Sequence, residues 1–98
     1  MKSFKNKVAA VTGAGSGIGQ AIAIALAKQG CHLALSDISE AGLAKTVELL
    51  APYSVKVTTQ KVDVAKRDEV ATWAKAVVDE HGQVNLIFNN AGVAIGST

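Results

Sequence analysis

The stretch AAVTGAGSGIGQAIAIAL, residues 9–26, decides the fold of this chain. It begins with apolar residues, continues through glycines at positions 13, 15, 17 and 19, and ends in a segment rich in alanine and isoleucine. Glycine loses more backbone entropy on folding than any other residue, so such a cluster favours either a turn or a ligand close to the backbone. The segments on both sides of the cluster decide between these two explanations.

Two hydrophobic periods alternate along the chain. Apolar runs typical of strands cover residues 7–12, 31–36, 55–62 and 84–88, and helical patterns cover residues 17–29, 39–51 and 66–81. Strands separated by helices of this length need crossover connections, which are right-handed and produce parallel pairs. The sequence therefore predicts an α/β fold with a doubly wound parallel sheet in three αβα layers. No internal repeat or linker divides it, so residues 1–98 are expected to form one unit.

The helix expected at residues 66–81 has one apolar face and marked ends. Trp73 lies on the apolar face, which predicts core packing rather than stacking on a ligand. Gly82 follows the last turn as a left-handed exit, and His81 before it is placed where a cation suits the helix dipole. Neither His81 nor His32 has a second ligand at metal spacing, so we expect no metal site.

Composition excludes several classes of function. The chain has 98 residues, is 49% hydrophobic and carries a net charge of +2 without any basic run, so we expect neither a nucleic-acid partner nor a membrane partner. The apolar stretch before Thr12 is too short for a signal peptide. The single cysteine, Cys31, cannot close an internal disulfide and fits a reducing compartment. We therefore expect a cytoplasmic protein.

The glycine cluster is expected at the carboxyl end of the first strand and the start of the first helix. This is where a parallel α/β sheet presents its ligand crevice, and free N–H groups at a helix N-terminus stabilise an anion such as a pyrophosphate. A P-loop would need Lys and then Ser or Thr after its last glycine, whereas the chain continues with Gln20 after Gly19. The common G-x-G-x-x-G register also fails, because its third position falls on Ile18 or Gln20.

The chain instead contains T-G-x-x-x-G-I-G at residues 12–19, and here it resembles the short-chain dehydrogenase/reductase family. Three further features of that family follow in order: Asp37 in LALSDIS, the pair Asp63 and Val64 in KVDVA, and the sequence NNAG at residues 89–92. The resemblance implies the Rossmann-type strand order 3-2-1-4, with the chain as the amino-terminal, NAD(P)-binding segment of one incomplete domain.

The resemblance also implies roles for individual residues. Gly13 would shape the turn, Gly19 would allow close packing of helix on sheet, and Asp37 would accept hydrogen bonds from the adenosine ribose. The other cofactor-binding residues it implies are Ser16, Gly17 and Ile18 facing the pyrophosphate, Asp63 and Val64 flanking the adenine, and Asn90, Ala91 and Gly92 beside the nicotinamide ribose.

Each of these assignments has a structural alternative. Asp37 and Glu40 have the spacing of a capping box, so Asp37 could cap the second helix. Asp63 could form a turn at the end of a strand, and the two amides of NNAG could bond to neighbouring backbone. Ala65 stands where the family often has Thr or Ser, which removes a side-chain cap from the third helix.

The residues that would perform chemistry are not expected in this chain. The family resembled here transfers hydride between nicotinamide and a carbonyl or alcohol carbon, with a catalytic Ser and a Tyr-x-x-x-Lys pair. The chain has one tyrosine, Tyr53, and Lys56 follows it one residue too early, before the third strand. The catalytic residues would follow Thr98, so we expect the 98-residue chain to be a fragment and inactive by itself. A catalytically silent nucleotide-binding or assembly module is the alternative.

The cofactor and partners are expected as follows. Asp37 places a carboxylate at the ribose, while residues 14–16, Ile38 and Ser39 provide no cation for a 2′-phosphate. NAD is therefore expected in preference to NADP. The parent enzyme would act on a small-molecule carbonyl or alcohol and form a homo-oligomer.

Overall fold

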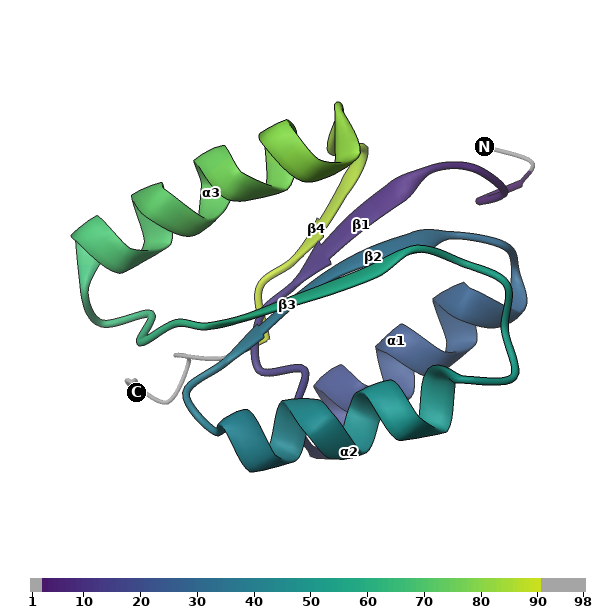
Figure 1. The fold of residues 1–98 in the computed structure, drawn as a ribbon, viewed down its shortest axis with the longest axis horizontal. Helices are drawn as coiled ribbons and strands as arrows, with labels where there is room; N and C mark the ends of the chain where they lie inside the picture. Colours follow the sequence, from purple (N-terminus) through teal and green to yellow (C-terminus); the bar gives the residue numbers. More distant parts are fainter. Residues whose placement is uncertain (1–2, 91–98) are drawn as a thin grey trace.

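The computed structural model describes residues 3–90, which form a parallel sheet covered by helices on both faces (Figure 1). The elements follow one another as β1 (Val8–Val11), α1 (Gly17–Lys28), β2 (His32–Asp37), α2 (Glu40–Leu50), β3 (Val57–Lys61), α3 (Arg67–His81) and β4 (Leu86–Phe88). The strand order is β3-β2-β1-β4, and all pairs are parallel. The Rossmann-like fold and its strand order are confirmed.

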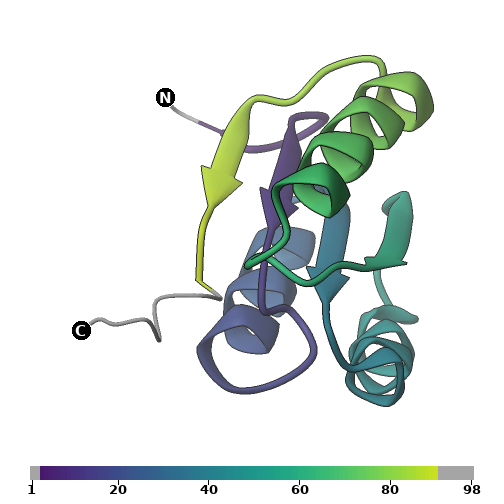
Figure 2. The ribbon, with the colours of Figure 1, turned by 90° about the vertical axis from the view of Figure 1, so that its left-hand side faces the viewer.

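The helices lie in two layers. α1 and α2 cover one face of the sheet and α3 covers the other, as both ribbon views show (Figures 1 and 2). This division follows from right-handed crossovers, because the chain moves outward from β1 to β3 and then returns past β1 to reach β4. β1 consequently lies between β2 and β4. Its carboxyl end is the point from which the connections of the two halves of the sheet run to opposite faces.

Alternate residues of β1 face the two helical layers. Ala9 and Val11 belong to a core cluster that includes side chains of α1 and α2. Ala10 belongs to a second cluster with Trp73 and Val77 of α3. Trp73 is 7% exposed, so the prediction that it packs in the core is confirmed.

All four strands begin one or two residues later than predicted, and at the two largest differences, in β3 and β4, a side chain takes the place of a backbone acceptor. The ladder of β4 begins at Leu86 rather than at residue 84, since Asn85 Oδ1 accepts the N–H of Val8 at 2.9 Å. At the start of β3, His32 Nδ1 accepts the N–H of Lys56 at 2.9 Å. The predicted strands 55–62 and 84–88 are observed as Val57–Lys61 and Leu86–Phe88.

The ends of α1 and α3 have the backbone geometry that the sequence predicts, but the cation at the end of α3 is a different residue from the predicted one. Gly30 and Gly82 have φ angles of 80° and 78°, the left-handed conformation expected after α1 and α3. At the end of α3, however, the Lys56 ammonium donates to the carbonyl of Glu80. The cation at this terminus is therefore Lys56, whereas His81 Nε2 lies 2.8 Å from the Thr58 hydroxyl.

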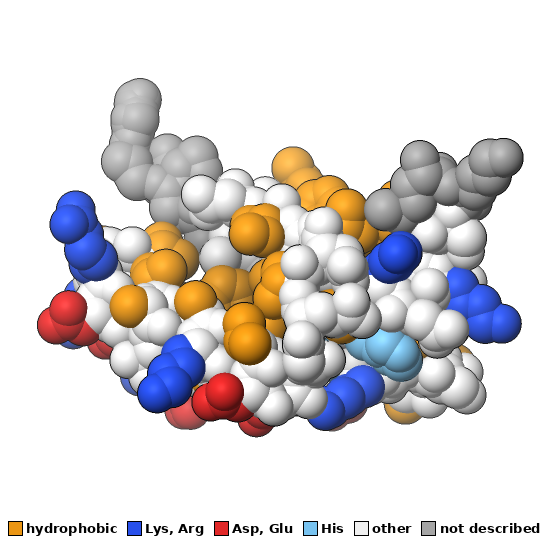
Figure 3. Space-filling view, turned by 90° about the horizontal axis from the view of Figure 1, so that it is seen from above, with side chains coloured by type: hydrophobic (Ala, Val, Ile, Leu, Met, Phe, Trp, Pro, Cys, Tyr) orange, Lys and Arg blue, Asp and Glu red, His pale blue; other side chains and the backbone are white. Residues whose placement is uncertain are grey.

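An apolar groove of about 380 Å³ lies between α3 and β4. Trp73, Val77 and Val84 line it, together with Val78 and Ile87, which are 52% and 73% exposed. Figure 3 shows hydrophobic side chains gathered in this hollow on the α3 face. β4 pairs with β1 along one edge, and no strand within residues 3–90 pairs with its other edge. Within the same residues, no helix is long and apolar enough to cross a membrane.

We expect the 98-residue chain, expressed alone, to associate with itself through β4 and the groove beside it. An unpaired apolar strand edge templates pairing with another chain. Ile87→Lys should shift the sedimentation coefficient toward the monomer value, at a cost in stability within about 0.5 kcal/mol because the side chain is exposed.

Leu49→Lys is the matched control, because Leu49 is 39% exposed on α2 and lies away from the groove. Its sedimentation should follow that of the wild type over the same concentration range. A wild-type chain that sediments as a monomer at every concentration would contradict the prediction.

The stability of the fold should decrease as the pH falls through the titration range of His81. Partial burial and, next, the Lys56 ammonium lower the pKa of His81 below its ordinary value of 6.5, and His32 acts in the same direction against Glu80. Below about pH 6.5 the unfolded chain then binds more protons than the folded one, so folding loses free energy. Urea unfolding of wild type and His81→Gln at pH 7.5, 6.5 and 5.5 measures this effect.

The stability advantage of the wild type over His81→Gln should shrink toward pH 5.5. A difference that stays constant over this range would show that His81 does not carry the pH dependence.

Candidate functional site

The glycine cluster forms a tight loop between β1 and α1. Gly13 and Gly17 have φ angles of 64° and 54°, which a residue with a side chain rarely adopts. A Cβ on Gly19 would lie 2.0 Å from the carbonyl oxygen of Gly13, so only glycine allows α1 to approach the end of β1 this closely. A Cβ on Gly17 would meet nothing within 4 Å, which leaves the outer side of the loop open.

The N-terminus of α1 carries no negative charge of its own. Its N-cap residue, Ser16, makes no side-chain capping bond, and its first turn contains no acidic residue. By contrast, the first turn of α2 contains Glu40, and that of α3 contains Asp68 and Glu69. The positive end of the α1 dipole is therefore not offset by a side chain of its own first turn, and Ser16, Gly17 and Ile18 are all exposed there.

Asp37 joins the end of β2 to the glycine loop. Its Oδ2 accepts the N–H of Gly15 at 2.8 Å, and its Oδ1 accepts the N–H of Ser39 at 2.9 Å. The N-cap of α2 is Ser39, whose hydroxyl accepts the N–H of Gly42. The capping box of Asp37 with Glu40 is therefore wrong, because α2 begins at Glu40, three residues after Asp37, and Ser39 takes the cap position.

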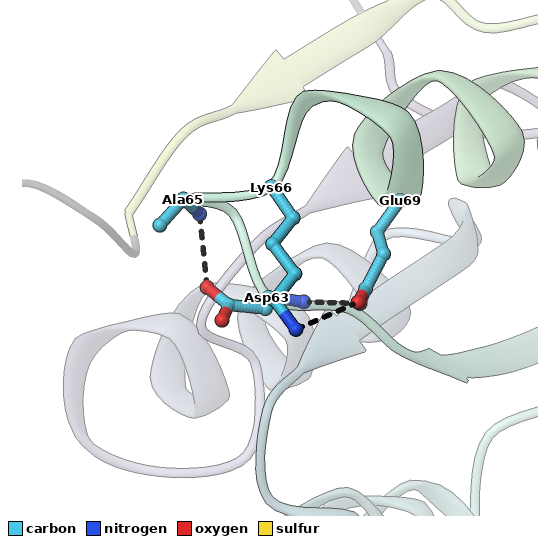
Figure 4. Close-up of polar contacts among 4 residues, drawn as sticks. All are labelled: Asp63, Ala65, Lys66 and Glu69. Carbon is cyan, nitrogen blue, oxygen red and sulfur yellow. Dashed lines mark hydrogen bonds and ion pairs between the residues drawn. The ribbon is translucent and has the colours of Figure 1, made fainter.

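Asp63 lies after β3 in a turn that leads into α3 (Figure 4). Its Oδ1 accepts the N–H of Ala65 at 2.9 Å, so the predicted turn-forming bond is present. Glu69 returns from the first turn of α3 to accept the N–H of Asp63 at 2.9 Å and lies 3.8 Å from Lys66. The N-cap of α3 is Lys66, which makes no side-chain capping bond. The position that lacks a side-chain cap is therefore residue 66 and not Ala65, as the sequence had predicted.

The asparagines after β4 reach the opposite side of the glycine loop. The Thr12 hydroxyl donates to Asn89 Oδ1 at 3.1 Å and accepts the N–H of Asn90 at 2.8 Å. A Cβ on Gly19 would lie 3.0 Å from Asn90 Nδ2, so this amide lies against the start of α1. Asn89 Oδ1 therefore bonds within the scaffold, but to a side chain rather than to the neighbouring backbone that the structural alternative named.

The structure thus brings Asp37 and Asn90 to two sides of one loop. Asp63 and Val64 follow the next strand outward at the same sheet edge, because all the strands are parallel. Val64 lines the end of the apolar groove with Thr12 and Asn89. The predicted site residues Ala91 and Gly92 lie outside the described residues. Among residues 3–90, no group of three or more His, Cys, Asp or Glu side chains could hold a metal ion.

Sequence reasoning missed the residues of α1 and α2 that support the loop. A Cβ on Gly42 would lie 2.7 Å from the carbonyl oxygen of Gly15, so α2 also approaches the loop backbone closely. Thr46 donates to the carbonyl of Ala14 at 2.7 Å and accepts from the Gln20 amide at 3.0 Å. A glycine and a threonine four residues apart inside a helix are the only sequence signal, and it identifies neither partner.

Comparison with known proteins places this geometry in a family. The short chain dehydrogenase family model matches residues 7–98. The chain is 49% identical over 94 residues, 96% of its length, to a Mycobacterium tuberculosis protein that carries the name oxidoreductase SadH. It covers 34% of that relative.

Two solved structures are similar in fold and sequence. A short-chain dehydrogenase/reductase from Burkholderia phymatum in complex with NAD has a TM-score of 0.83 and 39% identity, over 89% of this chain and 31% of that one. An alcohol dehydrogenase from the archaeon Thermococcus sibiricus complexed with 5-hydroxy-NADP has a TM-score of 0.78 and 40% identity, over 83% of this chain and 35% of that one.

The chain therefore spans about a third of the length of these relatives. Because the family model covers nearly all of it and the strand order agrees, the chain belongs to the short-chain dehydrogenase family of oxidoreductases.

Proposed function

We propose that this chain is the amino-terminal, dinucleotide-binding segment of one Rossmann-type domain in an NAD-dependent short-chain dehydrogenase/reductase. The parent enzyme would transfer hydride between nicotinamide and a carbonyl or alcohol carbon of a small molecule. One observation carries the proposal: the start of α1 bears no acidic residue and no side-chain cap, and it lies between Asp37 and Asn90.

The loop fits a pyrophosphate in both space and charge. The space outside Gly17 is open, and the exposed residues Ser16, Gly17 and Ile18 surround the first backbone N–H groups of α1. Helix N-terminal N–H groups and the positive end of the dipole both stabilise phosphate oxygens. Gly13 and Gly19 would keep the helix close enough to the strand for this loop to form.

Asp37 would accept hydrogen bonds from the adenosine ribose and discriminate against a 2′-phosphate. Each carboxylate oxygen already accepts one backbone N–H and retains acceptor capacity for a ribose hydroxyl. Lys61 is in register with Asp37 on β3, but it lines a shallow depression with Asp68 and Glu69. It therefore faces acidic groups of α3, which leaves Asp37 as the charge nearest the ribose.

The remaining cofactor contacts follow the sheet edge on both sides of β1. Asp63 and Val64 would flank the adenine: the Asp63 backbone N–H is already bonded to Glu69, and Asp63 Oδ1 is bonded to Ala65. The other Asp63 oxygen would remain for the adenine amino group. Asn90, with Ala91 and Gly92 after it, would line the crevice beside the nicotinamide ribose.

Tyr53 and Lys56 do not form a catalytic pair. Tyr53 lies in the loop before β3, at the amino ends of the strands, and therefore opposite the edge that carries the glycine loop. Its side chain packs against the core, and the Lys56 ammonium donates to the carbonyl of Glu80. This favours a parent enzyme whose Ser, Tyr and Lys follow Thr98. It is also compatible with the alternative, a catalytically silent nucleotide-binding module.

We also propose that the protein works in a reducing cytoplasm and that the parent enzyme forms a homo-oligomer. Cys31, the single cysteine, is fully buried, and burial raises the pKa of its thiol, which suits a small apolar core residue in a reducing cytoplasm. The exposed groove beside β4 favours a homo-oligomer or cover from another part of the parent protein.

The protein, in the length its gene encodes, should bind NADH at least about tenfold more tightly than NADPH. Two unit charges about 4 Å apart repel by about 4 kcal/mol at an effective dielectric constant of 20, and a third of that corresponds to about tenfold in affinity. Asp37→Asn should bring the ratio of the NADPH and NADH dissociation constants closer to one, because it removes the charge and keeps an acceptor for the Gly15 N–H.

Asp79→Asn is the matched control, because it removes the same charge from an exposed position in the last turns of α3. Its ratio should equal that of the wild type. Equal or tighter binding of NADPH by the wild type would remove Asp37 from the proposed role.

The purified 98-residue chain should show no alcohol oxidation or carbonyl reduction with either cofactor, because no described group is placed to give a proton to a substrate oxygen. Cofactor absorbance at 340 nm, followed over a panel of alcohols and ketones, measures this directly. Activity that co-purifies with the chain and disappears in Tyr53→Phe would show that Tyr53 is catalytic after all.

A further inference from the structure

The peptide bond between Ala14 and Gly15 is held at both ends by side chains from two different elements. Its carbonyl accepts the hydroxyl proton of Thr46, from α2, at 2.7 Å. Its N–H donates to Oδ2 of Asp37, at the end of β2, at 2.8 Å. The C=O and N–H of a trans peptide point in opposite directions, so the two bonds together fix the orientation of this peptide plane.

Thr46 is built into the core for this contact. Its side chain is fully buried, and in the described part of the chain it is one of three buried polar residues, with Thr12 and Ser36. The Thr46 hydroxyl accepts a hydrogen bond from Gln20 Nε2 of α1 at 3.0 Å. A hydroxyl has one proton to donate, and two carbonyl oxygens lie within its reach: that of Ala14 at 2.7 Å and that of Gly42 at 3.1 Å. The shorter distance assigns the proton to Ala14.

Packing holds α2 against the same segment of the loop. A Cβ on Gly15 would lie 2.9 Å from Asp37 Oδ2 and 3.1 Å from the backbone of Gly42. A Cβ on Gly42 would in turn lie 2.7 Å from the carbonyl oxygen of Gly15. The loop backbone therefore has no room to move toward α2, and Thr46 lies one helical turn after Gly42 on the same side of the helix.

A flip of this peptide would be strongly unfavourable. It would direct the Ala14 carbonyl oxygen at the Asp37 carboxylate and leave Thr46 facing an N–H. An unpaired carbonyl in this buried position would also lose its hydrogen-bond energy. The fixed plane sets the direction in which the backbone leaves Gly15, and hence where the N–H groups of residues 16–18 point.

We propose that Thr46 is a positioning residue for the dinucleotide: through the Ala14 carbonyl it fixes the glycine loop in the conformation that binds the pyrophosphate. The role rests on the proposed function, since it concerns affinity for that ligand. Valine would fill the same volume without burying a hydroxyl, so packing alone gives no reason for threonine at this position. The Ala14 carbonyl, which needs a donor, provides the reason.

The test compares Thr46→Val with Thr46→Ser in the protein as its gene encodes it. Thr46→Val should weaken the binding of NADH and of ADP, which share the pyrophosphate, by about tenfold, because the Ala14 carbonyl loses its donor. Thr46→Ser keeps the donor and should bind within about threefold of the wild type. Val47→Thr, a swap of the same two residue types at an exposed position of α2, should leave both affinities unchanged.

A ligand-free measurement separates this role from general stability. Hydrogen exchange of the Gly15 amide, followed by NMR, should be faster in Thr46→Val and normal in Thr46→Ser. The increase at Gly15 in Thr46→Val should exceed the increase at amides of α3, which reports the loss of global stability from the unpaired carbonyl. If Thr46→Val does not fold, Gln20→Met gives the second variant, because it removes the donor that orients the Thr46 hydroxyl. Its loss of affinity should be smaller than tenfold but measurable.

The outcomes distinguish the two proposals. If the wild type binds neither NADH nor ADP, the proposed function fails and the role of Thr46 in binding fails with it, while Gly15 exchange still decides whether Thr46 holds the loop. If the wild type binds and Thr46→Val binds equally tightly, with normal Gly15 exchange, the proposed function stands and the role of Thr46 is overturned.

Discussion

The approach of α1 to the end of β1 is the constraint on which the rest of the structure depends. A Cβ on Gly19 would lie 2.0 Å from the Gly13 carbonyl oxygen, so the helix can start here only if this residue has no side chain. The chain must then reverse direction within a few residues, which explains the left-handed φ of 64° at Gly13. The helix N-terminus is thereby held at the carboxyl edge of the sheet, beside the two neighbouring strands.

The position of β1 between β2 and β4 determines which side chains can meet around the loop. Asp37 comes from the end of β2 and bonds to Gly15, whereas Asn90 follows β4 and lies against Gly19. The two residues are far apart in the chain, and parallel pairing of both strands with β1 brings their ends to one edge. Open α/β sheets bind ligands at such a point because the connections on its two sides diverge and leave a crevice.

The opposite edge of the sheet has a different chemistry. At this edge, where the strands begin, lie Tyr53, Lys56, His32 and His81. Tyr53 packs against the core, and the side chains of the other three bond to backbone and to Thr58 within the scaffold. These are residue types that could catalyse proton transfer, but they face away from the glycine loop. Their positions show why the topology of a parallel sheet decides function: residue type alone does not say at which end of a strand a group lies.

The sequence by itself determined the order of elements, the fold class, the family and the conformation of the glycine loop, because these depend on local signals. Hydrophobic periods mark β1 to β4 and α1 to α3, and the glycines at positions 13 and 19 are required by backbone geometry within a single loop. Strand ends were misplaced where a side chain of Asn85 or His32 takes a backbone position in the ladder. No local pattern encodes that replacement.

Only the tertiary structure decided which side chain supports the glycine loop and which cation binds a carbonyl at the end of α3. The bond from Thr46 to Ala14 spans 32 residues, and the bond from Lys56 to the end of α3 spans 24. Such contacts depend on how α2 and the loop before β3 lie in space, and a hydrophobic period specifies a buried face but not the partner of one hydroxyl or one ammonium group on it. The physical reason is that periodicity is a property of a single segment, whereas a hydrogen bond between segments requires their relative placement.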